Sequence, residues 1–195
     1  MQQQKKGLST FWNWGHKHIA LLTPPPTDTT ALEDRIEGFV QAHAEKGGVM
    51  VDRNLWLNNI TSTLPNAFRP PNFTQDIKKI KDHLVKFPYI TALFAAEYYI
   101  ALMAKKAVKE LGMRVPEDIS IICFDSPPRR IGGDFHLTYL SQDQEKMGQK
   151  VFDLLLKLKS KEEQEETPKR LLLDASLVVG DSTAEVSSKK QNKLS

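Results

Sequence analysis

Short apolar segments recur along the chain and are separated by longer segments of mixed polarity. Runs of strand length lie at 18–23, 49–51, 89–95 and 119–124. Such runs, bounded by Pro, Gly or polar residues, are typical of buried β-strands. The run at 119–124 is apolar on both faces, which is the pattern of a parallel strand covered on both sides. Further strands are predicted near 137–140, 171–173 and 177–179.

The segments between these strands carry apolar residues three and four positions apart. One such stripe contains Leu32, Ile36 and Phe39, and similar stripes run through 77–84, 100–111 and 147–158. This spacing predicts amphipathic helices that each bury one face. Strands that alternate with helices predict the α/β class, with a parallel sheet flanked by helices.

The two ends of the chain are mostly polar, whereas the middle holds the regular pattern. We therefore expect a loose or partly helical leader at 1–14, one folded domain at 15–184 and a disordered tail at 185–195. A chain of 195 residues is long enough for one domain with a substantial core. No apolar run approaches the ~20 residues of a membrane-spanning helix, so we expect no membrane contact.

Charge and cysteine content narrow the function classes. The formal net charge of +3 is too small to predict nucleic-acid binding by this chain itself. The single cysteine, Cys123, lies inside an apolar run, so we expect a buried thiol and no disulfide. This cysteine usage fits the reducing cytosol, and we expect a cytoplasmic location.

Polar side chains stand where predicted strands end. Glu97 follows the 89–95 strand, Asp125 follows the 119–124 strand, and Arg35 lies early in the helix after the first strand. In an open α/β sheet, ligands bind beyond the carboxyl ends of the strands. An arginine and two carboxylates at that rim can hold a polyhydroxylated ligand. Trp56 can offer an apolar face to a sugar ring.

Each of these four side chains also has a purely structural explanation. Arg35 can pair with an acidic residue on its own helix, and Glu97 can be an anion favoured by a helix dipole. Asp125 can cap a turn, and Trp56 can be a packing residue. The residue pattern alone therefore leaves both explanations open for a polar rim on an α/β domain.

The sequence contains no recognisable catalytic or metal-binding motif. It has neither a glycine-rich phosphate loop nor a Gly-x-Ser-x-Gly nucleophile elbow. His16 and His18 can share a strand face, but two histidines without a third ligand are a weak metal signal. We therefore expect no enzyme activity, no catalytic residue, no bound metal and no cofactor.

Several segments resemble the LacI/GalR family of bacterial transcription regulators. Residues 15–22, GHKHIALL, are similar to the family's GHxxIA strand, and 35–39, RIEGF, are similar to its RxxGF helix. The stretch 94–120 begins with FAA and ends with GMRVPEDIS, which is similar to the family's FAANDxIA…VPEDIS stretch. The last resemblance joins LTYL…MG at 137–148 to LVVGDSTA at 177–184.

The resemblance covers about 15–184 and implies a periplasmic-binding-protein-like domain that senses a small effector, most often a sugar, and dimerises. It places the family's RxxGF arginine on Arg35 and its aspartate after the core strand on Asp125. Glu97 and Tyr98 stand where the family has Asn-Asp, which favours an alternative in which a dimerisation module has lost its sensing site. A second alternative is a transport-linked sugar-binding protein of the same fold.

The resemblance also implies that the chain is truncated at its N-terminus. The chain begins where the family's second lobe begins, so we expect mainly the C-terminal lobe, and DNA contact only through a headpiece that this chain lacks. The strand near 137–140 and the helix at 141–160 would belong to, or pack on, the mostly missing first lobe. The helix's apolar stripe must then fold back, meet a second copy or stay mobile. We expect a homodimer, and weak or absent effector binding by this chain alone.

Overall fold

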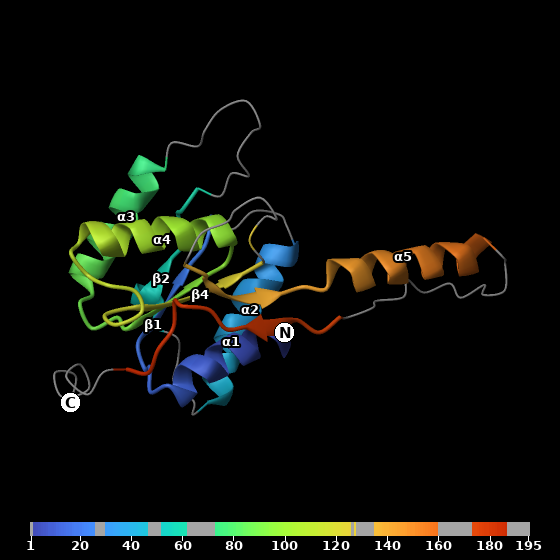
Figure 1. The fold of residues 1–195 in the computed structure, drawn as a ribbon, viewed down its shortest axis with the longest axis horizontal. Coiled ribbons are helices and arrows are strands. Elements are labelled where there is room, and N and C mark those ends of the chain that lie inside the picture. The colour runs from blue at the N-terminus through green and yellow to red at the C-terminus, as the bar shows by residue number, and fades with distance from the viewer. Residues whose placement is uncertain are drawn as a thin grey trace.

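The apolar segments assemble into one six-stranded sheet with the order β2-β1-β3-β4-β5-β6 (Figure 1). The structure, a computed structural model, describes residues 2–25, 30–46, 52–61, 73–125, 127, 135–159 and 173–186. The strands are β1 Ile19–Leu22, β2 Trp56–Leu57, β3 Ala92–Ala95, β4 Ser120–Phe124, β5 Thr138–Ser141 and β6 Ser176–Val178. Neighbouring strands are parallel except β5 and β6.

Helices cover both faces of this sheet. They are α1 Gln2–Asn13, α2 Thr30–Glu45, α3 Thr74–Lys86, α4 Tyr98–Glu110 and α5 Gln144–Lys159, with a short 3-10 helix, η1 Arg53–Leu55, before β2. α1 and α2 lie on one face, α3 and α4 lie on the other, and α5 extends away from the sheet (Figure 1). This architecture confirms the predicted α/β class with a parallel sheet flanked by helices.

Two hydrophobic clusters, one on each face, hold the layers together. Because alternate residues of a strand point to opposite faces, Leu93 of β3 joins the cluster beneath α3 and α4. Its neighbour Phe94 joins the cluster beneath α1 and α2. Every residue of β1, β3 and β4 is buried. This two-sided burial explains why these strands are continuous apolar runs in the sequence.

The leader predicted at 1–14 as loose or partly helical contains the helix α1, and this helix packs on the sheet. Leu8 and Phe11 on α1 are fully buried, and their helical spacing places them on one face. α1 lies so close to the sheet that a Cβ atom at Gly7 would come within 2.8 Å of the Phe94 ring. Glutamines and lysines precede this short apolar face, so the segment has the composition of a polar leader in the sequence. α1 is therefore a layer of the domain.

The structure contains a strand, β2, at positions where the sequence pattern predicted none. The predicted strand at 49–51 falls outside the described residues, as do 171–172. β2 consists of Trp56 and Leu57, which align with the end of β1. Trp56 therefore lies within a strand. The strand predicted at 177–179 corresponds to β6, one position earlier.

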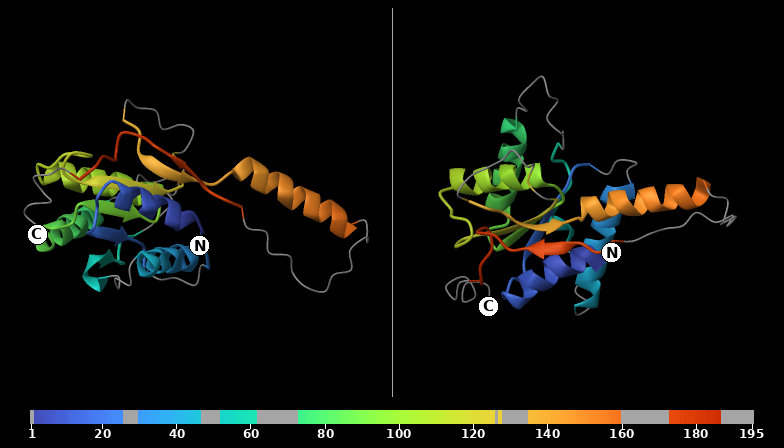
Figure 2. Two further views of the ribbon diagram at one scale, coloured as in Figure 1. Left: turned by 90° about the horizontal axis from the view of Figure 1, so that it is seen from below. Right: turned by 45° about the vertical axis from the view of Figure 1, so that its right-hand side comes forward.

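The strand predicted near 137–140 belongs to this sheet and not to another lobe. β5 pairs with β4 in parallel and with β6 in antiparallel orientation. Its residues Thr138 and Leu140 are fully buried. The prediction that this strand is a remnant of a first lobe is therefore wrong, because its pairing partners and its core contacts are all in the present sheet. α5, in contrast, does leave the sheet (Figure 2).

The chain after β6 returns to the start of β1 and closes the domain. His16 is buried, and its Nε2 donates a hydrogen bond to Ala184 O at 3.0 Å. Val186 N donates to Trp14 O at 2.9 Å. The first two residues of the predicted tail are thus described, and the second of them is hydrogen-bonded, whereas 187–195 lie outside the described residues.

Candidate ligand-binding site

Arg35 connects the carboxyl ends of two neighbouring strands. It lies in the second turn of α2, and its Nη1 donates to Ala96 O at 2.8 Å. Its Nη2 lies 3.2 Å from Asp125 Oδ2 and 3.3 Å from Asp125 Oδ1. Ala96 directly follows β3 and Asp125 directly follows β4. The structure therefore brings Arg35 and Asp125 together at the carboxyl ends of the parallel strands.

This ion pair lies against a buried aromatic ring. The Arg35 guanidinium carbon is 4.4 Å from the centroid of the Phe124 ring, which is a favourable cation–π distance. Phe124 is the last residue of β4 and is almost fully buried. The Arg35 side chain is 17% exposed and the Asp125 side chain 40% exposed. The Phe124 ring, the Ala96 carbonyl and the Asp125 carboxylate together fix the Arg35 side chain. Within the ion pair, Asp125 is more exposed to solvent than Arg35.

Asp125 also forms the turn that ends β4. Its φ is 70°, in the left-handed region that aspartate tolerates better than most residues. Its backbone N–H donates to Leu140 O at 3.1 Å. The backbone of Asp125 thus turns the chain at the end of β4, while its carboxylate pairs with Arg35. A role of this carboxylate in ligand binding stays a prediction.

Gln142 is a rim residue that the sequence pattern did not reveal. It follows β5, and its Nε2 donates to Asp125 Oδ1 at 3.3 Å. A signal for it existed, because Gln142 follows a predicted strand just as Asp125 does. The family resemblance, which places that strand in the first lobe, points away from Gln142. Asp125 thus lies between an arginine and an amide, each from a different element.

Glu97 lies at the same rim, next to the carbonyl that Arg35 binds. It is the N-cap residue of α4, and its side chain makes no capping hydrogen bond to the first turn. The helix dipole still favours an anion at this position. Burial, with smaller contributions from Cys123 and neighbouring tyrosines, raises the pKa of the Tyr98 phenol.

Trp56 has the contacts of a packing residue. Its Nε1 donates to Thr23 Oγ1 at 3.0 Å, and its half-buried side chain packs against the cluster beneath α1 and α2. The hydrogen bond fixes the indole beside the exit of β1. A role as a platform for a sugar ring stays a prediction.

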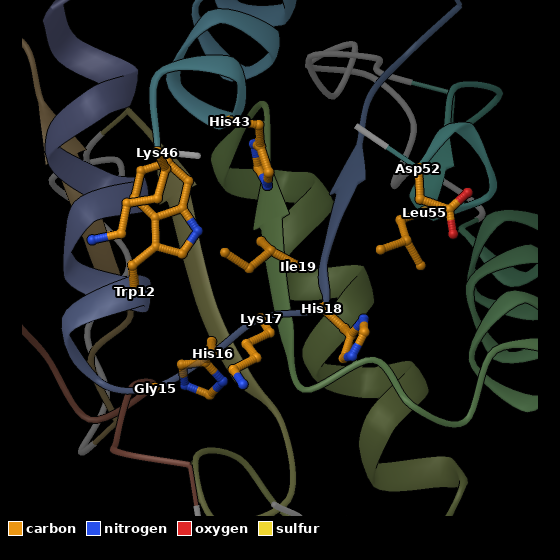
Figure 3. A pocket seen from close by; sticks show the side chains of 10 residues that line it. All are labelled: Trp12, Gly15, His16, Lys17, His18, Ile19, His43, Lys46, Asp52 and Leu55. Atoms are coloured by element: carbon orange, nitrogen blue, oxygen red, sulfur yellow. The ribbon is translucent and has the colours of Figure 1, made fainter. Parts of the chain in front are cut away.

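A cavity of about 550 Å³ lies at the opposite, amino end of the sheet (Figure 3). Figure 3 shows Trp12 and Lys46 on one side and Leu55 on the other, with Ile19 and His18 between them. None of the four predicted site residues lines this cavity. Its walls come from α1, α2, η1 and the start of β1, which are distant in the sequence, so no local motif indicated it.

The histidines at this end have structural partners. His43 Nδ1 donates to Phe39 O at 3.0 Å, and its ring meets Trp12 edge to face at 5.3 Å. Burial lowers the pKa of His43, against an opposing effect of that hydrogen bond.

Within the described ranges, no cluster of three His, Cys, Asp or Glu side chains has the arrangement to hold a metal ion. None of the helices in the same ranges has the length and apolar character to cross a membrane.

Comparisons with known proteins agree on one fold. A family model described as a periplasmic binding protein-like domain matches residues 8–183. The HTH-type transcriptional repressor PurR of Aliivibrio fischeri is 31% identical over 142 residues, which cover 73% of this chain and 39% of PurR. The HTH-type transcriptional repressor CytR of Escherichia coli is 30% identical over 178 residues, which cover 90% of this chain and 48% of CytR.

A solved structure shares the arrangement of elements. The complex of the transcriptional regulator CelR with cellobiose superposes with a TM-score of 0.70 at 26% identity, covering 92% of this chain and 49% of CelR. The chain therefore spans less than half the length of each of these three proteins.

Proposed function

Because this chain belongs to the family of periplasmic-binding-protein-like domains found in LacI-type transcription regulators, we propose that it senses a small effector of the sugar class for such a regulator. Its relatives PurR and CytR are named as HTH-type transcriptional repressors, and CelR was solved with cellobiose bound. The chain acts by binding and not by catalysis, in the cytosol, where a regulator meets both its effector and its operator.

The observation that carries this proposal is the Arg35–Asp125 pair. Arg35 is fixed by Ala96 O at 2.8 Å and by Asp125 at 3.2 Å, so its direction is set before a ligand arrives. Asp125 is the more exposed partner and can accept hydrogen bonds from sugar hydroxyls, while unused guanidinium N–H groups donate to sugar oxygens. Glu97 adds a second carboxylate at this rim, and Trp56 supplies an apolar face.

The rim forms one wall of a binding site. In two-lobed binders a ligand contacts both lobes and draws them together, and a regulator transmits that movement to its DNA-binding part. The relatives are more than twice as long as their matched regions. We therefore assign the second wall and the operator contacts to segments outside this chain, and expect this chain alone to assemble as a homodimer and to bind effector weakly.

A thermal-shift screen tests the proposal. Pentoses, hexoses, disaccharides and nucleosides are added to the purified chain, and the melting temperature is followed. At least one sugar should raise it, with a Kd of roughly millimolar because only one wall is present. The Arg35→Met variant should lose this response, whereas Lys46→Met, at the other end of the sheet, should keep it. An unchanged melting temperature with every compound, or equal responses in both variants, would contradict the proposed function.

A further inference from the structure

One wall of the cavity at the amino end of the sheet is held in place by specific contacts. Trp12 meets the His43 ring edge to face at 5.3 Å, and the ammonium of Lys46 lies 5.6 Å from the centroid of the Trp12 ring. Figure 3 shows Trp12 and Lys46 together on one side of the cavity. Gly15, whose φ is 81°, turns the chain from α1 toward β1, and its backbone N–H donates to Trp12 O at 3.0 Å. The fold therefore fixes the position of the indole.

The opposite wall is held by a second set of contacts. Asp52 Oδ1 accepts a hydrogen bond from Asn54 N at 2.9 Å, and Asp52 Oδ2 accepts one from Tyr89 OH at 3.4 Å. The Tyr89 ring in turn meets the His18 ring at 5.1 Å. Buried Leu55 lies beside Asp52 on this side (Figure 3). Both carboxylate oxygens of Asp52 are thus engaged by protein donors.

The lining of the cavity is mainly apolar, and several of its polar groups already have partners. Ile19, almost fully buried, lies between the two walls (Figure 3). His16 uses both ring nitrogens, Nδ1 with Thr91 Oγ1 and Nε2 with Ala184 O, each at 3.0 Å. His43 Nδ1 donates to a carbonyl of its own helix at 3.0 Å. A polyhydroxylated ligand would lose hydrogen bonds to water here without replacing them, whereas an apolar ligand would not.

The charged side chains of the lining favour an anion. Among the described lining residues, Lys17 and Lys46 are cations and Asp52 is the single acidic residue. Both lysines are exposed, so each ammonium group can turn toward a ligand at the mouth of the cavity and donate hydrogen bonds to it. An exposed ion pair contributes little affinity by itself. The apolar part of the ligand must therefore supply most of the binding energy.

From these observations we propose that the amino-end cavity binds a small aromatic carboxylate. The aromatic ring of the ligand lies between Trp12 and Leu55, where it can pair with the indole edge to face or offset. The carboxylate lies at the mouth and accepts hydrogen bonds from Lys17 and Lys46. The volume of about 550 Å³ falls in the usual range of small-molecule pockets, about 300–1,000 Å³. This site is separate from the Arg35–Asp125 rim and does not rest on the proposed sugar sensing.

Calorimetry with indole-3-acetate tests the class of ligand. The purified chain should bind this acid with a Kd of about 1 mM or below, and should bind neutral indole-3-acetamide about fivefold more weakly. A variant with Lys17→Met and Lys46→Met keeps the apolar stems and should bind the acid no better than the amide. The control, Lys106→Met with Lys109→Met at exposed positions of α4, should keep the preference for the acid. No binding of the acid, or equal affinities of the unmodified chain for acid and amide, would overturn the proposal.

NMR shows where the acid binds. Indole-3-acetate should cause saturable shifts of the Trp12 indole N–H and of the methyl groups of Ile19 and Leu55, because the ring current of the ligand acts on nearby nuclei. The Arg35 side chain should not shift. Saturable shifts of Arg35 without shifts of Trp12 would place the carboxylate at the rim and overturn the cavity site. Sugar binding at the rim is measured with different ligands, so the two proposals fail independently.

Discussion

The two ends of the parallel sheet differ in how their charged side chains are arranged. At the carboxyl end, Arg35 and Asp125 meet at 3.2 Å over the ring of Phe124, and no large cavity is needed to bring them together. At the amino end, Lys46 and Asp52 line a cavity of about 550 Å³ without forming a pair in it. The largest described cavity and the organised ion pair therefore lie at different ends of the sheet.

The physical reason lies in the direction of the strands. Parallel strands all deliver their following residues to one edge, so side chains after β3, β4 and β5 gather there whatever their distance in the sequence. Residues that precede strands gather at the other edge. In this chain they hold the C-terminal segment against the sheet. His16 and Trp14 there hold the returning C-terminal segment. The two ends should therefore respond independently to substitution.

The largest expected effect is on the amino end and its covering helix. Phe11→Ala removes a fully buried ring of α1 and should destabilise the domain by about 3–5 kcal/mol, the usual cost of deleting a core phenylalanine. Urea unfolding measures this loss. In the folded fraction, sugar affinity should not change. A loss below about 0.5 kcal/mol would show that the packing of α1 does not stabilise the domain.

A smaller effect is expected from the ion pair at the carboxyl end. Asp125→Asn keeps the shape and tolerates the positive φ, but it leaves a mostly buried Arg35 without its counterion. We expect a loss of about 1–2 kcal/mol in the free energy of unfolding, less than for a fully buried pair because Asp125 is 40% exposed. The same variant should weaken sugar binding about tenfold or more. Lys46→Ala provides the matched control at the amino end, and equal losses in the two variants would remove the distinction between them.

Gln142 should contribute less than Asp125. Its amide donates one hydrogen bond of 3.3 Å to the carboxylate, and such a bond contributes about 0.5–1.5 kcal/mol. Gln142→Ala should therefore weaken sugar binding severalfold and leave the fold intact. Isothermal calorimetry on both proteins gives the ratio. Unchanged affinity would show that Asp125 is oriented by Arg35 alone.

The smallest effect concerns pH at the amino end. Burial lowers the pKa of His43 below its ordinary 6.5. The unfolded chain therefore takes up a proton at a higher pH than the folded one, and stability should fall as the pH drops from 6.5 through the folded pKa. Burial and Lys86 lower the pKa of His83 in the same direction. His43→Phe should reduce, but not abolish, the loss of stability between pH 7 and pH 5, as measured by urea unfolding at each pH. An identical pH profile in this variant would argue against burial of the ring.

The sequence predicted the carboxyl end much better than the amino end. Arg35 and Asp125 are predicted because ligands bind beyond the carboxyl ends of parallel strands. The resemblance to the family's RxxGF helix and core strand points to the same two residues. Gln142 follows from the same rule, but its strand was assigned elsewhere. At the amino end, the burial of Phe11 depends on how α1 meets the sheet. The cavity depends on α1, α2 and η1 together. No local pattern encodes such long-range placement.

A titration with sugars tests most directly whether the Arg35–Asp125 rim binds the ligand. The chain labelled with nitrogen-15 is titrated with ribose and cellobiose to millimolar concentration, and amide and side-chain shifts are followed by NMR. We expect saturable shifts for the Arg35 side chain, the Gln142 amide and the backbone of Ala96, Glu97 and Asp125. The signals of Trp12, His43 and Lys46 should not change. Shifts confined to the residues of the amino-end cavity would contradict a ligand site at the rim, as would the absence of saturable shifts anywhere.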